Sequence, residues 1–423
     1  MTRKKIDLVE LQRTAKERTV KTQNIEYDLE TIVRRIKNGH IKLDPEYQRN
    51  HRWADDVSSR LIESLILNIP IPTIYLSQDF DADEEIGENI ARFSVVDGQQ
   101  RLTAIKNFLE NELCLTEMEV LKDLNGCYYE ELPGFLKRRL DERTIKFLRI
   151  DSTLDAQVKY DIFERLNTGS VRLEAQELRN ALYRGDFNNF MKKLALNESF
   201  MNTLQIKKSE RNKNKKVEKM EDVELILRFL SFYNDSYCSY KPNMKEFLSD
   251  SMEKNNRDFN KEKFKEMLLV FLLTIRLIEE YMGKFPFAKF KFAGLEEGAK
   301  KFSYASRFNT AIYDVVTVAF ADEIILKFAD LKMELSNLDN MYADIKDFND
   351  TEINFPEFEA IYAAFNEKIK SRIDFSSLYN KYVSLFAEND FVNTISGSTN
   401  DKSKIESRIK SFKLLIRGEI VES

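Results

Sequence analysis

Cysteine, histidine and tryptophan are scarce in this 423-residue sequence, which contains three, two and one of them. The three cysteines, Cys114, Cys127 and Cys238, lack the spacing of metal ligands, so we expect free, buried thiols and a reducing, cytoplasmic setting. The sequence contains no Walker loop, no Gly-x-Ser-x-Gly elbow and no Cys/His metal motif. Classical serine, cysteine or zinc catalysis is therefore not expected.

Glycine and proline are also rare, at 12 and 7 residues, which favours helices over an all-strand architecture. The longest apolar run, Met267–Leu273, falls far short of the roughly 18 to 20 residues that span a bilayer, so we expect a buried helix and no membrane partner. Residues 1–7 are charged where a secretory signal would be apolar. The net charge of −5 provides no general basic field, so any nucleic-acid contact has to be local.

The most informative stretch is residues 92–109, which predicts a strand, a tight turn and a helix. Phe93, Val95 and Val96 form a short apolar strand, and Gly98, which has no side chain, permits a tight turn. The apolar residues that follow recur at helical spacing. A helix N-terminus has unpaired N–H groups and a positive dipole, so the turn attracts an anion such as a phosphate, and Arg101 adds a bidentate charge.

The turn is unusually polar, because Asp97, Gln99, Gln100 and Arg101 lie between two apolar runs. Burying such side chains without partners would cost about 1 to 3 kcal/mol each, so we expect them to face a solvated cleft. A tight structural connection is the alternative reading of the same pattern.

Further motifs surround this turn in the sequence. They are Asp97-Gly98-Gln99-Gln100-Arg101 with Leu102-Thr103-Ala104-Ile105, Tyr47-Gln48-Arg49-Asn50-His51-Arg52-Trp53, Leu61–Ser64 with Ile69–Pro72, and Phe163–Gly169 with Glu177–Asn180. Together they resemble the domain-of-unknown-function family 262, the N-terminal domain of GmrSD-like and SspE-like bacterial restriction factors. The resemblance implies a ParB-like or sulfiredoxin-like fold that places a nucleotide's phosphates on the glycine turn.

The expected ligand contacts include residues of the turn and of other segments. Nucleotide or phosphate binding is expected from Gly98, Gln99, Arg49, Tyr47, Thr103 and Asn167. Two of these residues have a second reading, since Arg49 can pair with nearby acids and Asn167 can cap its own helix. Trp53 is expected to seal the core rather than stack on a base.

GmrSD-like and SspE-like proteins combine this domain with a histidine-dependent HNH nuclease, whereas this sequence has no histidine after His51. We therefore expect a stand-alone form: a nucleotide-binding, NTP-hydrolysing sensor or switch subunit of a bacterial restriction or anti-phage system. Its partners would be a nucleotide, DNA, a separate nuclease subunit and a second copy of the chain. A non-enzymatic DNA-binding regulator is the alternative, and a ParB-like DNA nickase with a carboxylate base is the third reading.

Hydrolysis would use the turn itself. Asp97 would hold Mg²⁺ or orient water, Gln100 or Gln48 would position the attacking water, and Arg101 would stabilise the phosphates. An acidic stretch, residues 79–88, is expected to be a solvated hairpin tip rather than a metal site.

The predicted fold class is α+β, with a small mixed α/β N-terminal domain and a mainly helical C-terminal domain. The boundaries are residues 1–24 for a lead-in, 25–200 for the ParB-like domain, 201–220 for a basic linker or loop, and 221–423 for the helical domain. The basic segment is the candidate DNA contact, through Lys207, Lys208, Arg211, Lys213, Lys215 and Lys216, with a solvated surface loop as the alternative.

Overall fold

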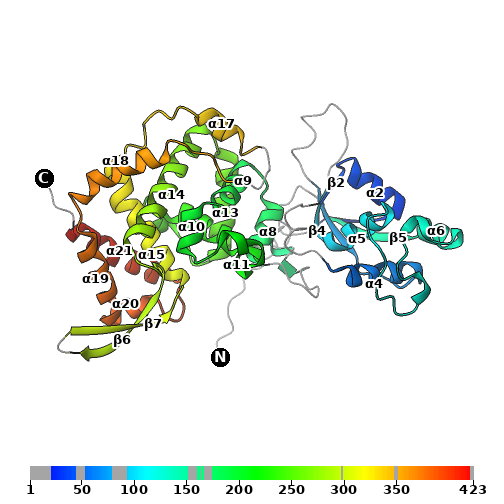
Figure 1. Ribbon diagram of the computed structural model, residues 1–423, viewed down its shortest axis with the longest axis horizontal. Helices are drawn as coiled ribbons and strands as arrows, with labels where there is room; N and C mark the ends of the chain where they lie inside the picture. Colours follow the sequence, from blue (N-terminus) through cyan, green and yellow to red (C-terminus); the bar gives the residue numbers. More distant parts are fainter. Residues whose placement is uncertain are drawn as a thin grey trace, which may run out of the picture. The chain divides into compact units, whose positions relative to one another are not determined.

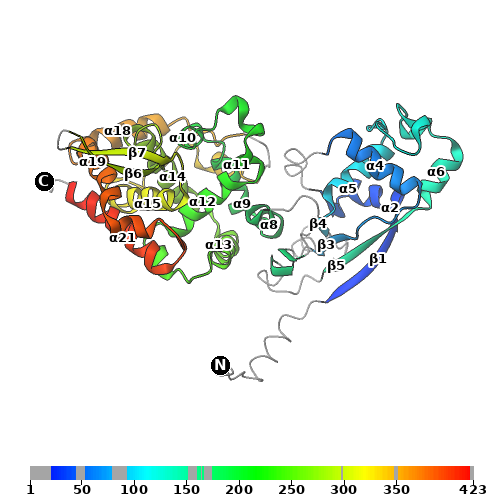
Figure 2. The same cartoon turned by 90° about the horizontal axis from the view of Figure 1, so that it is seen from below.

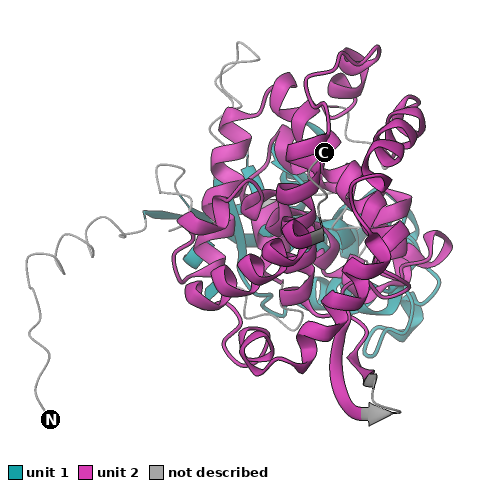
Figure 3. Ribbon diagram, turned by 90° about the vertical axis from the view of Figure 1, so that its left-hand side faces the viewer, with its two compact units in different colours: residues 1–173 teal, residues 174–423 magenta. Residues whose placement is uncertain are grey.

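The computed structural model describes residues 21–43, 53–78, 93–150, 160–162, 164–165, 174–296, 299–346 and 351–419. The chain divides into two compact units, unit 1 with residues 1–173 and unit 2 with residues 174–423, which are coloured separately in Figure 3. Unit 1 contains a mixed sheet with helices, and unit 2 is mainly helical (Figures 1 and 2). The predicted α+β fold class is confirmed.

The sheet of unit 1 has five strands in the order β1-β5-β3-β4-β2. Their bounds are β1 Thr22–Asp28, β2 Ile41–Lys42, β3 Ile74–Gln78, β4 Phe93–Asp97 and β5 Thr144–Ile150. β4 runs parallel to β2 and antiparallel to β3, while β5 runs parallel to β3 and antiparallel to β1. Crossover connections are needed between parallel neighbours, and helices supply them.

The helices of unit 1 follow the sequence pattern. They are α2 Leu29–Lys37, α4 Asp55–Ile66, α5 Gln99–Leu109 and α6 Gly134–Asp141, with 3-10 turns η1 Lys122–Leu124 and η2 Tyr129–Glu131. Asp28 caps α2 by accepting the Thr31 N–H at 2.7 Å. The apolar spacing of residues 55–68 predicts a helix with Val57, Leu61, Leu65 and Ile69 on its inward face. Leu61 and Leu65 are buried, but Val57 and Ile69 are 40% and 52% exposed, so that part of the prediction is wrong.

Unit 2 is built around α14. Its helices are α8 Ala175–Leu182, α9 Asp186–Leu194, α10 Glu198–Thr203, α11 Lys215–Glu218, α12 Glu221–Phe232, α13 Met244–Asp258, α14 Lys261–Tyr281, α15 Thr310–Phe320, α16 Leu326–Phe328, α17 Leu338–Ala343, α18 Phe358–Lys370, α19 Phe375–Ser384, α20 Asn389–Thr394 and α21 Lys402–Glu419. Shorter elements are the 3-10 turns η3 Lys208–Lys213, η4 Ser236–Ser239 and η6 Leu385–Ala387, and the π-helix η5 Ala321–Ile325. Residues 267–273 of α14 are all buried, as the apolar run predicts, which makes α14 a central core helix.

Two predictions for unit 2 need correction. The helical pattern of residues 304–328 predicts one helix, but α15 begins only at Thr310, because residues 289–306 form the antiparallel hairpin of β6 Lys289–Glu296 and β7 Ala299–Ser306. The pattern of residues 173–196 also predicts one helix, but this range is divided into α8 and α9, which are separated at Gly185. The basic segment predicted at 201–220 lies within unit 2, where it contains η3 and α11.

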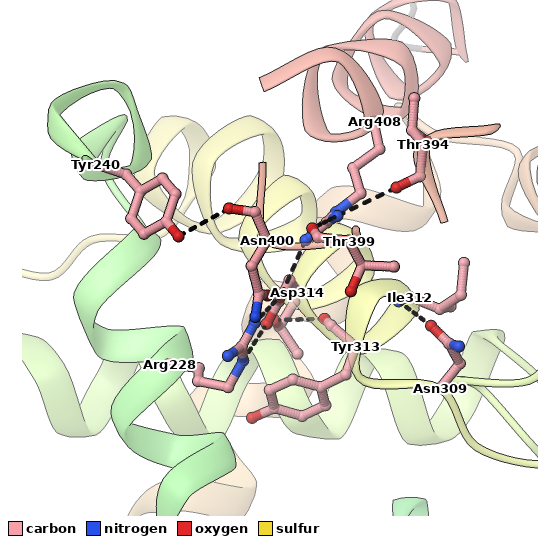
Figure 4. A network of polar contacts seen from close by, with 11 residues as sticks. Arg228, Tyr240, Asn309, Ile312, Tyr313, Asp314, Thr394, Thr399, Asn400 and Arg408 are labelled. Atoms are coloured by element: carbon pink, nitrogen blue, oxygen red, sulfur yellow. Dashed lines mark hydrogen bonds and ion pairs between the residues drawn. The ribbon is translucent and has the colours of Figure 1, made fainter. Parts of the chain in front are cut away.

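A buried ionic network joins α12, α15 and α21 (Figure 4). Arg228 Nε donates to Asp314 Oδ1 at 2.9 Å, and Arg408 Nη2 donates to Asp314 Oδ2 at 3.2 Å. Arg408 also donates to the carbonyls of Thr394 and Thr399. Asp314 and Arg408 are fully buried, so the network is a structural element of the core.

Candidate functional site

The β4–α5 turn has the predicted strand, glycine and helix order. Gly98 lies between β4 and α5 with φ +99° and ψ 12°, a conformation that favours glycine. A Cβ added at Gly98 would lie 2.8 Å from Cγ1 of Ile74, a fully buried residue at the start of β3. A side chain at this position is therefore excluded both by the backbone conformation and by contact with the neighbouring strand.

Arg101 is largely buried, with 9% of its surface exposed. Its Nη2 donates to Asp97 Oδ2 at 2.9 Å, and its Nη1 donates to the carbonyl of Pro72. Burial lowers the pKa of the guanidinium, while Asp97 acts in the opposite direction. Arginine still stays charged, so Asp97 and Arg101 form an ion pair that connects the two sides of the turn.

Gln100 is 8% exposed, and its two amide atoms have different surroundings. Its Oε1 accepts the backbone N–H of Trp53 at 3.1 Å, whereas its buried Nε2 has no hydrogen-bond partner among the residues that the structure describes. A buried donor without a partner costs about 1 to 3 kcal/mol. Such an atom calls for an explanation, and a ligand or an ordered water is the usual one.

The other predicted residues of the turn are also placed. Gln99 is buried, and the hydroxyl of Thr103 donates to the Gln99 carbonyl at 2.9 Å within α5. Only Asp97 has a substantially exposed side chain, at 41%. The expectation that all four polar residues face a solvated cleft is therefore wrong for Gln99, Gln100 and Arg101.

Several predicted residues lie outside the described parts of the chain. They are Tyr47, Gln48, Arg49, His51, Asn167 and the acidic stretch 79–88. Trp53 is described and packs against the core of unit 1, as expected. All three cysteines are free, as predicted, but Cys114 and Cys127 are only half-buried and Cys238 is exposed, so the predicted burial is wrong for Cys238.

The basic segment of unit 2 is partly committed to structural contacts. Arg211 Nη2 lies 3.1 Å from Oδ2 of Asp222, which is buried. The ammonium of Lys216 lies 3.4 Å from the centre of the Phe308 ring, and burial lowers its pKa. The exposed basic side chains of the segment are those of Lys207, Lys208, Lys213 and Lys215. These four side chains are open to solvent, although the Lys207 ammonium lies 3.3 Å from Oε1 of Glu210.

Metal-binding clusters and membrane-spanning helices are both absent from the described residues. No group of three or more His, Cys, Asp or Glu side chains there is arranged to hold a metal ion. Within the same ranges, no helix has the length and apolar character needed to cross a bilayer.

The sheet and its strand–glycine–helix turn define unit 1 as a small α+β domain with one conspicuous polar turn. Residues 29–184 match the family model described as the N-terminal domain of the GmrSD restriction endonuclease. This part of the chain, less than half of it, is therefore similar to the N-terminal domain of a restriction endonuclease. Neither the curated proteins nor the solved structures gave a significant match.

Proposed function

We propose that unit 1 binds a nucleoside triphosphate at the β4–α5 turn, and that the chain is a nucleotide-hydrolysing sensor or switch subunit of a restriction or anti-phage system. The observation that carries the proposal is the buried Nε2 of Gln100 at the N-terminus of α5, which has no hydrogen-bond partner within the described part of the chain. A phosphate oxygen would satisfy this donor, and the positive end of the helix would favour its charge. The GmrSD-like domain match supports the restriction context.

Each residue of the turn has a proposed role. Gly98 allows the backbone amides to approach phosphate, and Gln100 donates through Nε2. Asp97 holds Mg²⁺ with the phosphates or orients the attacking water. Arg101 acts through Asp97, which it already contacts, and is therefore a positioning residue rather than a direct phosphate ligand. Contacts from Tyr47, Gln48, Arg49 and Asn167 belong to the same proposal.

Gln100→Glu is the sharpest test of this site. Glutamate retains an oxygen that can accept the Trp53 N–H, and it replaces the unpartnered donor with a carboxylate oxygen that repels phosphate. We expect nucleotide affinity to fall about 10-fold or more, the equivalent of about 1.4 kcal/mol. Gln23→Glu, which adds the same charge at an exposed position of β1, is the matched control and is expected to bind normally.

The assays are nucleotide-induced thermal shift and phosphate release from each common triphosphate, with and without DNA. The proposal fails if no triphosphate stabilises the wild-type chain, or if Gln100→Glu binds as well as Gln23→Glu. Nucleotide binding without phosphate release would support the binding site but contradict the proposed hydrolase activity.

A non-enzymatic DNA-binding regulator is the second candidate. It is favoured by the four exposed lysines of the basic segment. Replacing Lys207, Lys208, Lys213 and Lys215 with Gln would then abolish salt-dependent DNA retention, with no phosphate release from any triphosphate in the wild-type chain. Retention that survives these four changes would reject the assignment of DNA binding to this segment.

A further inference from the structure

The β6–β7 hairpin is locally basic in an acidic protein. It extends from the helices of unit 2 in two perpendicular views (Figures 1 and 3). Residues 284–307, the hairpin with its flanks, contain six basic and two acidic residues, a net charge of +4, whereas the whole chain has −5. A positive field is therefore concentrated on this element, which a polyanion would recognise.

The strand register gives the hairpin an aromatic face and a polar face. Phe292 lies opposite Phe302, and Phe290 lies opposite Tyr304. Because side chains alternate along a strand, the Lys291–Ser303 pair lies on the other face. Lys291 and Ser303 are exposed, as is Lys301, two residues before Ser303 on the same strand.

The base of the hairpin is fixed to the helical body. Phe290 is 8% exposed, and its ring centre lies 5.2 Å from that of Phe386 on η6. Lys289 Nζ donates to the hydroxyl of Ser396 at 2.8 Å. These contacts fix the orientation of the hairpin relative to the helices of unit 2.

Further along the hairpin the rings are open to solvent. Phe292 is 40% exposed and Tyr304 is 50% exposed. The ring centre of Tyr304 lies 5.5 Å from that of Phe285, and Arg307 and Lys284 lie over the same Phe285 ring at 5.2 Å and 5.5 Å. Cationic groups therefore flank a strip of exposed aromatic surface.

We propose that the β6–β7 hairpin binds single-stranded nucleic acid. Unpaired bases stack on the exposed rings of Phe292 and Tyr304, and the phosphates meet Lys284 and Arg307, which lie over the neighbouring Phe285 ring. A duplex keeps its bases stacked on one another, so it cannot use the rings in this way. The assignment is independent of the nucleotide site proposed for unit 1.

The principal test is fluorescence anisotropy with labelled (dT)20, r(U)20 and a blunt 20-base-pair duplex. The double variant Phe292→Ala/Tyr304→Ala is expected to bind the single strands at least about 10-fold more weakly than the wild-type chain, because base–aromatic stacking contributes about 1 to 3 kcal/mol per base. Phe135→Ala removes a 60% exposed ring from unit 1 and is the matched control, expected to bind as the wild type does.

A second pair of variants keeps the test valid if the double alanine variant misfolds. Phe292→Trp retains a ring and is expected to retain affinity. Lys284→Gln/Arg307→Gln retains the rings of Phe292 and Tyr304 and is expected to lower the magnitude of the salt slope of log K by about 1.4, or about 0.7 for each phosphate that a cation no longer neutralises.

Binding of either single strand with these losses supports the proposal. It is overturned if the wild-type chain binds neither strand, binds the duplex equally well, or keeps its affinity in the ring variant and its salt slope in the charge variant. Triphosphate binding is measured on the same variants and is expected to be unchanged, so failure of one proposal does not imply failure of the other.

Discussion

At Gly98 the left-handed backbone and the contact with Ile74 act together. We expect Gly98→Ala to lower the free energy of unfolding by about 1 to 3 kcal/mol, because Ala strains the positive φ and its Cβ meets a buried side chain. Gly39→Ala is the matched control, since Gly39 has φ +72° but nothing within 4 Å of an added Cβ. Urea unfolding measures both variants, and an equal loss in the two would contradict the role of the Ile74 contact.

The residues of the turn show what the sequence can predict and what it cannot. The pattern around Gly98 was sufficient to predict strand, turn and helix, because apolar periodicity and glycine are local signals. The burial of Arg101 was not predicted. Its pairing with Asp97 depends on the direction in which the chain leaves Gly98, and its contact with Pro72 joins segments far apart in the sequence.

At the scale of elements, Asp222 connects the start of α12 to Arg211 of η3. Burial raises the pKa of the Asp222 carboxyl to about 6, although Arg211 and the Val223 N–H oppose the shift. As the pH rises, the Asp222 carboxyl of the unfolded chain therefore loses its proton first, and the native state keeps the proton until a higher pH. The stability contributed by this proton is complete below about pH 4 and is lost as the pH rises through about 6.

This behaviour gives a measurable pH dependence. Between pH 4.5 and 6.5 the wild-type chain is expected to lose about 1 to 2 kcal/mol more unfolding free energy than Asp222→Asn, whose side chain does not titrate. Urea unfolding at the two pH values provides the comparison. Identical pH dependence in the two proteins would contradict the raised pKa.

Elements were predicted well where their signals were local. The sequence pattern predicts helices over residues 28–37, 244–252 and 259–281. Asp28, Asn243 and Asn260 cap the three helices at or near these starts, which reflects the preference of short polar side chains for that position. The β6–β7 hairpin was missed, although Lys289–Phe292 alternates charged and aromatic residues with the period of a strand. This alternation covers only a few residues, and the segments on both sides of it have helical patterns, so the strand was not predicted.

At the scale of the whole molecule, the two compact units each have a buried core, so we expect calorimetry to show two unfolding transitions. Asp314→Asn should lower one transition alone, because it leaves the buried guanidiniums of Arg228 and Arg408 without their counter-charge, at a cost of about 3 to 5 kcal/mol. Gly98→Ala should lower the other. A single transition displaced by both substitutions would contradict two separately cooperative units.

Because Arg101 is already neutralised by Asp97, an incoming ligand would meet oriented peptide dipoles rather than a bare positive charge. The attraction of a dipole weakens with distance faster than that of an ion, so the turn would attract distant anions only weakly. Added salt would therefore change the affinity for the ligand little. Discrimination at such a turn would arise on close contact, from fit and hydrogen-bond direction.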